Sequence, residues 1–197
     1  DTDPTALTLG PVEYGWTGYF YSGLDAAQPG NWWENPIDRL AHGNKPLVQW
    51  YLEQMQAYEV ANGVRILDYF DLHYYPAAPG VTLNEAGDDN LQALRLRTTR
   101  SLWDETYTDE SWIGAPSQAI RQVNLIPRMR DWVNTYYPGT RLAISEYNFG
   151  GLEHINGALT QADVLGIFGR EGMDLATLWD PPTASQPGAY AFRMYRN

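Results

Sequence analysis

The feature that most constrains the fold of this 197-residue chain is the regular alternation of strand-like and helix-like segments. Strand-like runs are expected at residues 12–21, 65–75, 141–146 and 175–179. Helix-like runs are expected between them and after them, at residues 46–62, 88–101, 117–137, 156–172 and 190–196. Because strands that alternate with helices join through right-handed crossovers, this order predicts an α/β fold with a parallel sheet.

Local signals place several helix ends. Pro46 suits the first turn of a helix, and Asn62-Gly63 is a good stop at its end. Asp88 and Asp89 precede the next helix as a cap. Pro127 falls inside the run over 117–137, so we expect a kink there.

Composition limits the classes of partner. The formal net charge of −11 disfavours nucleic acid and anionic membrane surfaces, which bind mainly through Lys and Arg clusters. The chain has no cysteine, so disulfides and thiolate chemistry are excluded. Aromatic residues make up 14% of the chain. Flat rings stack on sugar faces but also fill ordinary cores, so they favour a carbohydrate partner only weakly.

The run Arg141–Gly150 ends an apolar strand with a carboxylate. Leu142, Ile144 and Glu146 share one face of the strand because side chains alternate. A Glu at a strand end is often a salt-bridge partner or a helix cap. In a parallel sheet, however, the carboxyl ends of the strands carry the chemistry, which makes Glu146 a candidate catalytic residue.

Three of the expected strands end in residues that suit attack on a sugar. A carboxylate held by a His and a Tyr, beside a Trp, fits a nucleophile directed at an anomeric carbon. The residues at these strand ends are Asp71, His73, Tyr75, Glu146, Asn148 and Trp179. Each residue alone is weak evidence for a catalytic site, because a buried His or a strand-end Trp is more often part of a core.

Other chemistries lack their motifs. Neither H-E-x-x-H, nor G-x-S-x-G, nor a Gly-rich dinucleotide or phosphate loop occurs. No metal site and no required cofactor are therefore predicted. A structural calcium ion stays open, since Glu85, Asp88 and Asp89 lie close in sequence, but they lack a recognised ligand spacing and helix capping is favoured.

Blocks across nearly the whole chain resemble glycoside hydrolase family 44, a family of retaining endo-β-glucanases and xyloglucanases. The blocks follow the family order and read RILDYFDLHYYP at residues 65–76, DESWI at 109–113, LAISEYN at 142–148, GALTQADVLGIFGREGMDLATLW at 157–179 and AFRMYRN at 191–197.

The resemblance implies a (β/α)8 TIM barrel that carries an additional β-sandwich domain. Residues 1–197 would form a partial barrel, with strands five to eight at 12–21, 65–75, 141–146 and 175–179, and with the sandwich outside the chain. Glu146 matches the nucleophile that follows strand seven. The general acid/base is a second Glu in an Asn-Glu-Pro-like context after strand four, so we expect it, and the N-terminal barrel half, to lie upstream. Glu34-Asn35-Pro36 has the wrong order for that motif, and Glu34 is not assigned the role.

The first hypothesis is therefore the C-terminal barrel half of a retaining endo-β-1,4-glucan hydrolase acting on a β-glucan polysaccharide. In it Glu146 is the nucleophile, and the residues expected around it or on the sugar are His73, Tyr75, Tyr147, Asn148, Trp179, Trp32 and Trp33. Four strands would leave two open sheet edges, so the isolated chain is expected to be unstable or to associate. The alternatives are a carbohydrate-binding fragment without activity and a core fragment without a ligand. An extracellular location is expected from the polymeric substrate.

Overall fold

The structure is a computed structural model that describes residue 3 and residues 5–196. These residues divide into two compact units, each with its own core. Unit 1 comprises Asp1–Tyr74 and Met129–Ser145, and unit 2 comprises Tyr75–Arg128 and Glu146–Asn197, within the described range. The last residue of the AFRMYRN block lies outside that range.

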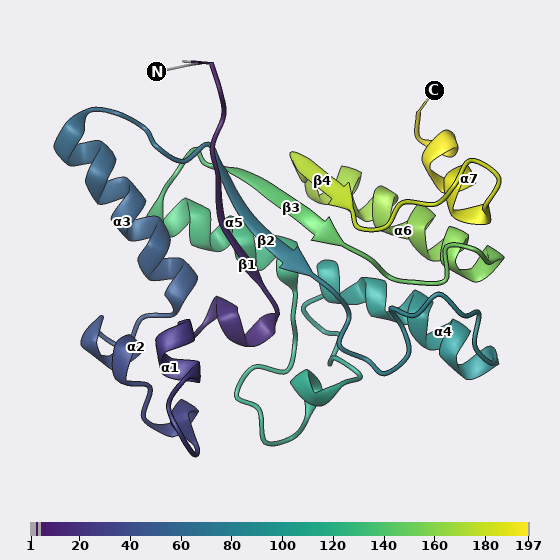
Figure 1. Cartoon of the computed structure of the whole chain (residues 1–197), viewed down its shortest axis with the longest axis horizontal. Coiled ribbons are helices and arrows are strands. Elements are labelled where there is room, and N and C mark those ends of the chain that lie inside the picture. The colour runs from purple at the N-terminus through teal and green to yellow at the C-terminus, as the bar shows by residue number, and fades with distance from the viewer. Residues whose placement is uncertain (1–2, 4, 197) are drawn as a thin grey trace. The chain divides into compact units, whose positions relative to one another are not determined.

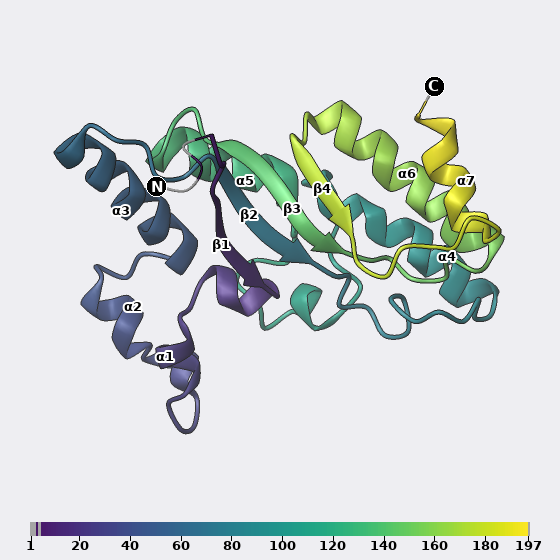
Figure 2. The ribbon, with the colours of Figure 1, turned by 45° about the horizontal axis from the view of Figure 1, so that its top comes forward.

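The strands are β1 (Leu9–Tyr14), β2 (Tyr69–Tyr74), β3 (Arg141–Tyr147) and β4 (Leu175–Leu178), and their order in the sheet is β1-β2-β3-β4. In unit 1, β1 and β2 lie side by side and run parallel, with Tyr14 opposite His73 (Figure 2). A bulge between Pro11 and Glu13 shifts the register. The predicted parallel α/β sheet is confirmed.

Helices α3 to α7 follow the predicted order, whereas the two short helices α1 and α2 were not predicted (Figure 1). The helices are α1 (Gly23–Ala26), α2 (Ile37–Ala41), α3 (Leu47–Asn62), α4 (Asp89–Thr98), α5 (Leu125–Tyr136), α6 (Ile155–Glu171) and α7 (Pro187–Met194). Short 3-10 turns cover Trp16–Tyr19, Trp32–Glu34, Thr99–Leu102 and Trp112–Gly114. None of the helices in the described part of the chain is long and apolar enough to cross a lipid bilayer.

Two helix-end predictions are confirmed by their capping contacts. Gly63 adopts a left-handed φ of 68° and ends α3, where its N–H donates to the Glu59 carbonyl. The Asp88 carboxylate accepts from the Leu91 N–H at 2.8 Å and so caps α4. This use of Asp88 agrees with capping rather than with a calcium site.

Several element boundaries differ from the prediction, two of them in the first two strands. The first strand ends at Tyr14 rather than Tyr21, because Gly15 turns the chain at a φ of 78° into a 3-10 turn that buries Trp16 and Tyr19. The second strand begins at Tyr69, not at Arg65.

The helix expected over 117–137 begins only at Leu125, so Pro127 falls in its first turn. Proline is tolerated there because the N–H groups of a first turn have no partner within the helix. The last helix begins at Pro187, three residues before the predicted start, for a similar reason.

The core of unit 1 is formed by side chains from both faces of its strands. Trp132 of α5 contacts Phe20 and Phe70 edge-on, with ring centroids 6.2 and 6.3 Å apart. Other buried side chains in this unit are Tyr19, Val48, Leu52, Leu72, Met129, Leu142 and Ile144.

A carboxylate also lies in this core. Asp71 of β2 is fully buried and accepts two hydrogen bonds from Ser145 of β3, one from its N–H at 2.8 Å and one from its hydroxyl. Both acceptor oxygens of Asp71 are thus engaged by the neighbouring strand. Asp71 therefore joins the two strands and is a structural residue.

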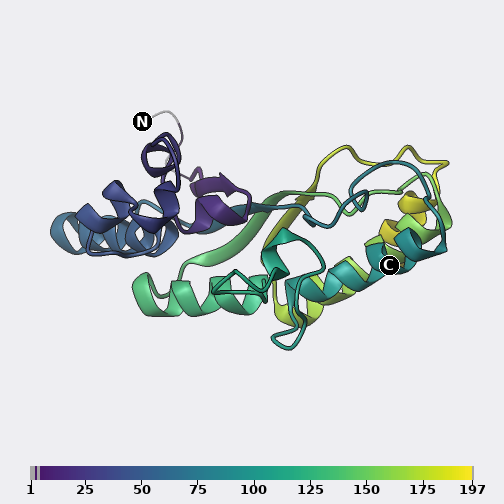
Figure 3. The ribbon, with the colours of Figure 1, turned by 90° about the horizontal axis from the view of Figure 1, so that it is seen from below.

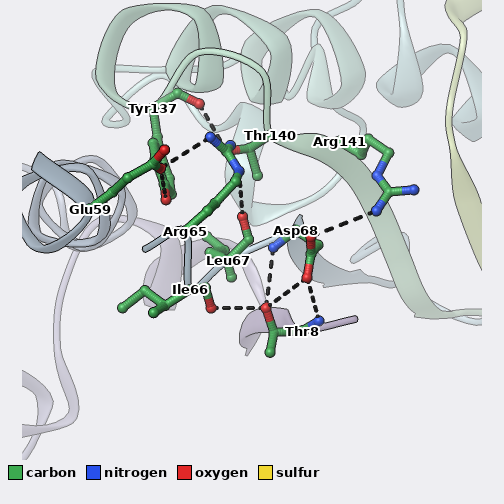
Figure 4. A network of polar contacts seen from close by, with 9 residues as sticks. All are labelled: Thr8, Glu59, Arg65, Ile66, Leu67, Asp68, Tyr137, Thr140 and Arg141. Carbon is green, nitrogen blue, oxygen red and sulfur yellow. Dashed lines mark hydrogen bonds and ion pairs between the residues drawn. The ribbon is translucent and has the colours of Figure 1, made fainter. Parts of the chain in front are cut away.

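Polar contacts at the amino ends of the strands surround Arg65 and Asp68 (Figure 4). Arg65 donates to Glu59, Thr140 and the Leu67 carbonyl, and its guanidinium lies 4.1 Å from the centroid of the Tyr137 ring. The Asp68 carboxylate accepts from the Thr8 N–H at 2.8 Å. These contacts replace the strand pairing that was expected over 65–68.

In unit 2, α6 packs against both α4 and α7. Figure 3 shows α4 and α6 running side by side. Near the end of α4, Asp104 accepts from the Thr106 hydroxyl and N–H at 2.7 and 2.8 Å, and from Arg100 at 2.9 Å. The Thr106 hydroxyl makes the largest contribution to lowering the pKa of Asp104 to about 2.

Replacing Asp71 with Ala is expected to lower the free energy of unfolding by about 1–3 kcal/mol, because a buried N–H and hydroxyl lose their acceptor. Ser145→Ala, which keeps the bond from its N–H, is expected to cost only about 1 kcal/mol. Urea unfolding of the two variants measures both values. Equal losses, or no loss for Asp71→Ala, would contradict the structural role of Asp71.

The low pKa of Asp104 predicts a contribution to acid stability. Because the folded-state pKa lies below the unfolded value, the contribution is fully present above about pH 4 and is lost as pH falls through about 2. Asp104→Asn should therefore show a smaller loss of stability between pH 4 and 2 than the parent in thermal unfolding. Glu105→Gln, at the next residue, is the control and should decline as the parent does.

Candidate active site

Glu146 lies one residue before the end of β3 in unit 2, and its side chain is half-buried. The Tyr75 hydroxyl donates a hydrogen bond to Glu146 Oε1 at 2.6 Å. Tyr75 follows β2 directly, so two strand ends supply the pair. The structure thus makes the contact that an orienting role for Tyr75 requires.

The hydroxyl of Tyr75 is protonated at neutral pH and can therefore donate to the carboxylate. Burial raises the pKa of Tyr75 well above its usual value, and the hydrogen bond to Glu146 raises it further. Tyr75 therefore acts as a hydrogen-bond donor to the carboxylate and holds it in one orientation.

Asn148 and Trp179 are joined through the backbone. Asn148 is almost fully buried; its amide donates to the Trp179 carbonyl at 2.8 Å and its oxygen accepts from the Gly150 N–H at 2.6 Å. The Trp179 N–H donates to the Tyr147 carbonyl at 2.9 Å. The backbone of Trp179 is thus held on two sides, while its indole ring is 59% exposed.

A cavity of about 560 Å³ lies beside these residues. Its lining contains Tyr75, Thr82, Asn84, Asn148, Leu178, Trp179, Asp180 and Pro181. This volume is within the roughly 300–1,000 Å³ of small-molecule sites. Glu146 is not part of the lining, but Tyr75, to which it is bonded, is.

Five lining residues were not predicted from the sequence, and one of them, Leu178, is the last residue of β4. Thr82 and Asn84 lie in the loop between β2 and α4, and Asp180 and Pro181 follow β4. Asp180 adopts a φ of 56°, which is uncommon for a residue other than Gly. The only sequence signal at these positions is turn chemistry, the pair Pro181-Pro182 above all.

The structure corrects the prediction for Tyr147. Its side chain is only 2% exposed, its hydroxyl accepts from Gln161 at 2.8 Å, and its ring packs edge-on against Phe168. Burial raises the pKa of Tyr147 to about 12. Successive side chains of a strand point to opposite faces, so Tyr147 and Glu146 lie on opposite faces of β3. Tyr147 is the one that points into the core of unit 2.

The other predicted site residues belong to unit 1. His73 of β2 is half-buried. Burial raises the pKa of Glu13, and the Tyr14 N–H and nearby His73 act in the opposite direction. Glu146 belongs to unit 2, so contact between His73 and Glu146 stays a prediction.

Trp32 and Trp33 form a perpendicular pair with ring centroids 5.6 Å apart. Trp32 also contacts Tyr21, and Trp33 is 52% exposed. Their contact with a sugar stays a prediction as well. Among residue 3 and residues 5–196, no group of three His, Asp or Glu residues is placed to hold a metal ion.

Comparisons with known proteins identify relatives of the chain. The sequence model of glycoside hydrolase family 44 matches residues 1–78. Endoglucanase A of Paenibacillus lautus is 38% identical over the whole of this chain, which covers 27% of that protein.

Solved structures agree with the sequence comparisons. CelM2, a bifunctional glucanase-xylanase from a metagenome library, is 48% identical, with a TM-score of 0.91 over 99% of this chain and 36% of that one. A family 44 xyloglucanase of Paenibacillus polymyxa is 34% identical, with a TM-score of 0.81 over 98% of this chain and 36% of that one.

The chain thus spans between about a quarter and about a third of the length of these relatives. The matching family is one of glycoside hydrolases, and the matching proteins are named as an endoglucanase, a glucanase-xylanase and a xyloglucanase. The sequence and structure comparisons therefore agree that this chain is similar to glycoside hydrolase family 44, and the resemblance seen in the sequence motifs is confirmed.

Proposed function

We propose that this chain is part of a retaining endo-β-1,4-glucan hydrolase in which Glu146 is the nucleophile. The observation that carries the proposal is the 2.6 Å hydrogen bond from Tyr75 to Glu146, made beside a cavity that an exposed Trp179 lines. The names of the relatives, an endoglucanase, a glucanase-xylanase and a xyloglucanase, support a polysaccharide substrate.

We further propose that β1 to β4 are strands five to eight of a (β/α)8 barrel. Their consecutive order, the parallel pairing of β1 with β2 and the alternation with helices suit that assignment. The close fit to about a third of each solved structure supports it, since half of a barrel would be less than half of a chain that also carries a second domain.

In the proposed reaction the Glu146 carboxylate attacks the anomeric carbon and forms a glycosyl ester, which water then cleaves. Tyr75 fixes the direction of attack by holding Oε1. The exposed indole of Trp179 offers a flat apolar surface for the C–H face of a sugar ring. This chemistry requires no cofactor.

Retention of configuration needs a second carboxyl group roughly 5–5.5 Å from the first. Asp71 is buried and engaged by Ser145, and Glu34 accepts from Asn31 on a turn of unit 1. Asp180 is the carboxylate that lines the cavity of unit 2 within the described residues. We propose that the acid/base lies in the part of the family 44 fold that this chain does not cover, and that the enzyme acts outside the cell on its polymeric substrate.

Glu146→Gln is expected to reduce hydrolysis by about 10³-fold or more, because an amide cannot form the glycosyl ester. The measurement is release of reducing sugar from carboxymethyl-cellulose and from xyloglucan. It is made on the 197-residue chain and on a longer form, in which the chain is preceded by its natural upstream sequence. Glu153→Gln is the control and should keep full activity, since Glu153 is an exposed residue between β3 and α6.

Turnover by the longer form alone, lost in Glu146→Gln, would support both the nucleophile and an acid/base outside the chain. Binding of oligosaccharide without cleavage by the 197-residue chain would fit the same proposal. Full activity of the 197-residue chain would instead contradict the position of the acid/base. Full activity of Glu146→Gln would contradict the nucleophile.

Tyr75→Phe is expected to lower kcat of the longer form by roughly 10- to 100-fold with a smaller change in KM, because the carboxylate loses its orienting donor but the cavity keeps its shape. Tyr107→Phe is the matched control, since the Tyr107 hydroxyl donates at 2.9 Å to Glu110, another carboxylate of the same unit. Steady-state kinetics measure both variants. Equal effects of the two would show that Tyr75 has no special role.

A further inference from the structure

The loop Val81–Ala86, here called the cleft loop, supplies Thr82 and Asn84 to the cavity lining. It lies between β2 and α4 and has no regular secondary structure of its own. Asn84 is exposed, and its amide can both donate to and accept from a sugar hydroxyl. These side chains can bind a ligand in a fixed geometry only if the loop itself is held in place.

Arg95 of α4 holds both ends of the cleft loop. Its side chain is fully buried, and its guanidinium donates to the Val81, Glu85 and Ala86 carbonyls, each at 2.9 Å. A further bond at 2.7 Å goes to the side-chain oxygen of Asn156 at the start of α6. The planar fork of one arginine thus satisfies three loop carbonyls and ties them to two helices.

The middle of the cleft loop is held by the turn that follows the Glu146 strand. The Gly151 N–H donates to the Leu83 carbonyl at 2.9 Å. A Cβ at Gly150 would lie 2.3 Å from the Val81 carbonyl oxygen, and one at Gly151 would lie 2.9 Å from Arg95 Nη1. Only glycines allow this approach, so the loop, Arg95 and the turn after Glu146 are packed as one assembly.

Burying the charged guanidinium of Arg95 costs desolvation free energy, so stability of the fold alone does not explain this arrangement. Burial of its guanidinium lowers the pKa of Arg95, with the charge of Glu85 acting in the opposite direction. Its hydrogen bonds go to neutral oxygens rather than to a carboxylate. An apolar side chain could fill the same space at less cost in desolvation, but it could not hold three carbonyls in fixed positions.

We propose that Arg95 is a positioning residue of the substrate site and that Asn84 is the sugar-binding residue through which it acts. The sugar unit that stacks on Trp179 receives hydrogen bonds from Asn84, and Arg95 fixes the loop from which that side chain extends. This inference rests on the proposed function, since it needs a β-glucan in the cavity.

A double-mutant cycle on cellotetraose binding tests the inference. Calorimetry is performed on the longer form carrying Glu146→Gln, which prevents turnover. Asn84→Ala and Arg95→Lys are each expected to weaken binding about fivefold, because each removes the effect of about one hydrogen bond. The double variant is expected to bind no more weakly than about the weaker single one, since both changes act on the same contact.

Arg97→Lys is the matched control. Arg97 lies on the same helix, is exposed and bonds Glu110 at 2.9 and 2.8 Å, so this change should leave binding unaltered. Hydrogen exchange of the unliganded protein gives a second readout, in which amides 81–87 should exchange faster in Arg95→Lys but not in Arg97→Lys. If Arg95→Lys fails to fold, Asn156→Ala, which removes one anchor of the guanidinium, takes its place in the cycle.

Additive effects of the two substitutions, or unchanged binding in Arg95→Lys, would overturn the inference and leave the proposed function standing. Failure of the parent to bind cellotetraose would overturn the proposed function, and the inference with it. Less-than-additive effects together with faster loop exchange support the inference.

Discussion

The structure of unit 1 depends on one carboxylate buried between two strands. Asp71 accepts the N–H and the hydroxyl of Ser145, so β2 and β3 are joined by a side chain where the chain approaches Glu146. A buried acid is tolerated only when its oxygens are fully hydrogen-bonded, and here both are. The same contact removes Asp71 from the list of catalytic candidates. Asp71 thus supports the fold, whereas Tyr75, which directly follows the same strand, donates to Glu146.

The sequence predicted those parts of the structure that local chemistry decides. Gly63 ends α3 and Asp88 begins α4, because a left-handed φ and a capping carboxylate act within a few residues of the helix end. The position of Glu146 near the end of a strand was likewise readable from the apolar run before it. The kink predicted at Pro127 was wrong because a proline inside a helix-like pattern marks either a kink or the first turn of a helix. Contacts with residues outside the pattern decide between the two.

The rest of the site could not be read from the sequence because its contacts are long-range. The cleft loop is held by Arg95, and Arg95 in turn by Asn156, which is 61 residues away. Nothing in the residues 81–86 themselves indicates that three of their carbonyls share one guanidinium. Tyr147 shows the complementary difficulty: its aromatic ring suits a sugar site, yet strand alternation turns it toward Phe168 and Gln161 in the core. Residue type alone therefore could not distinguish Trp179, which is exposed and lines the cavity, from Tyr147, which is buried.

The exposed ring of Trp179 follows from where its backbone is held. The Trp179 N–H and carbonyl bond to Tyr147 and Asn148, both of which are buried, so the residue is positioned by its main chain and its indole is left free to face the cavity. The next residue, Asp180, adopts a φ of 56°, a conformation that costs free energy unless the surrounding structure imposes it. A large apolar ring exposed on a rigid backbone forgoes the stabilisation that burial would give. In return the ring has a fixed orientation. A sugar that stacks on it would cause little further loss of side-chain conformational entropy, so more of the stacking free energy contributes to affinity.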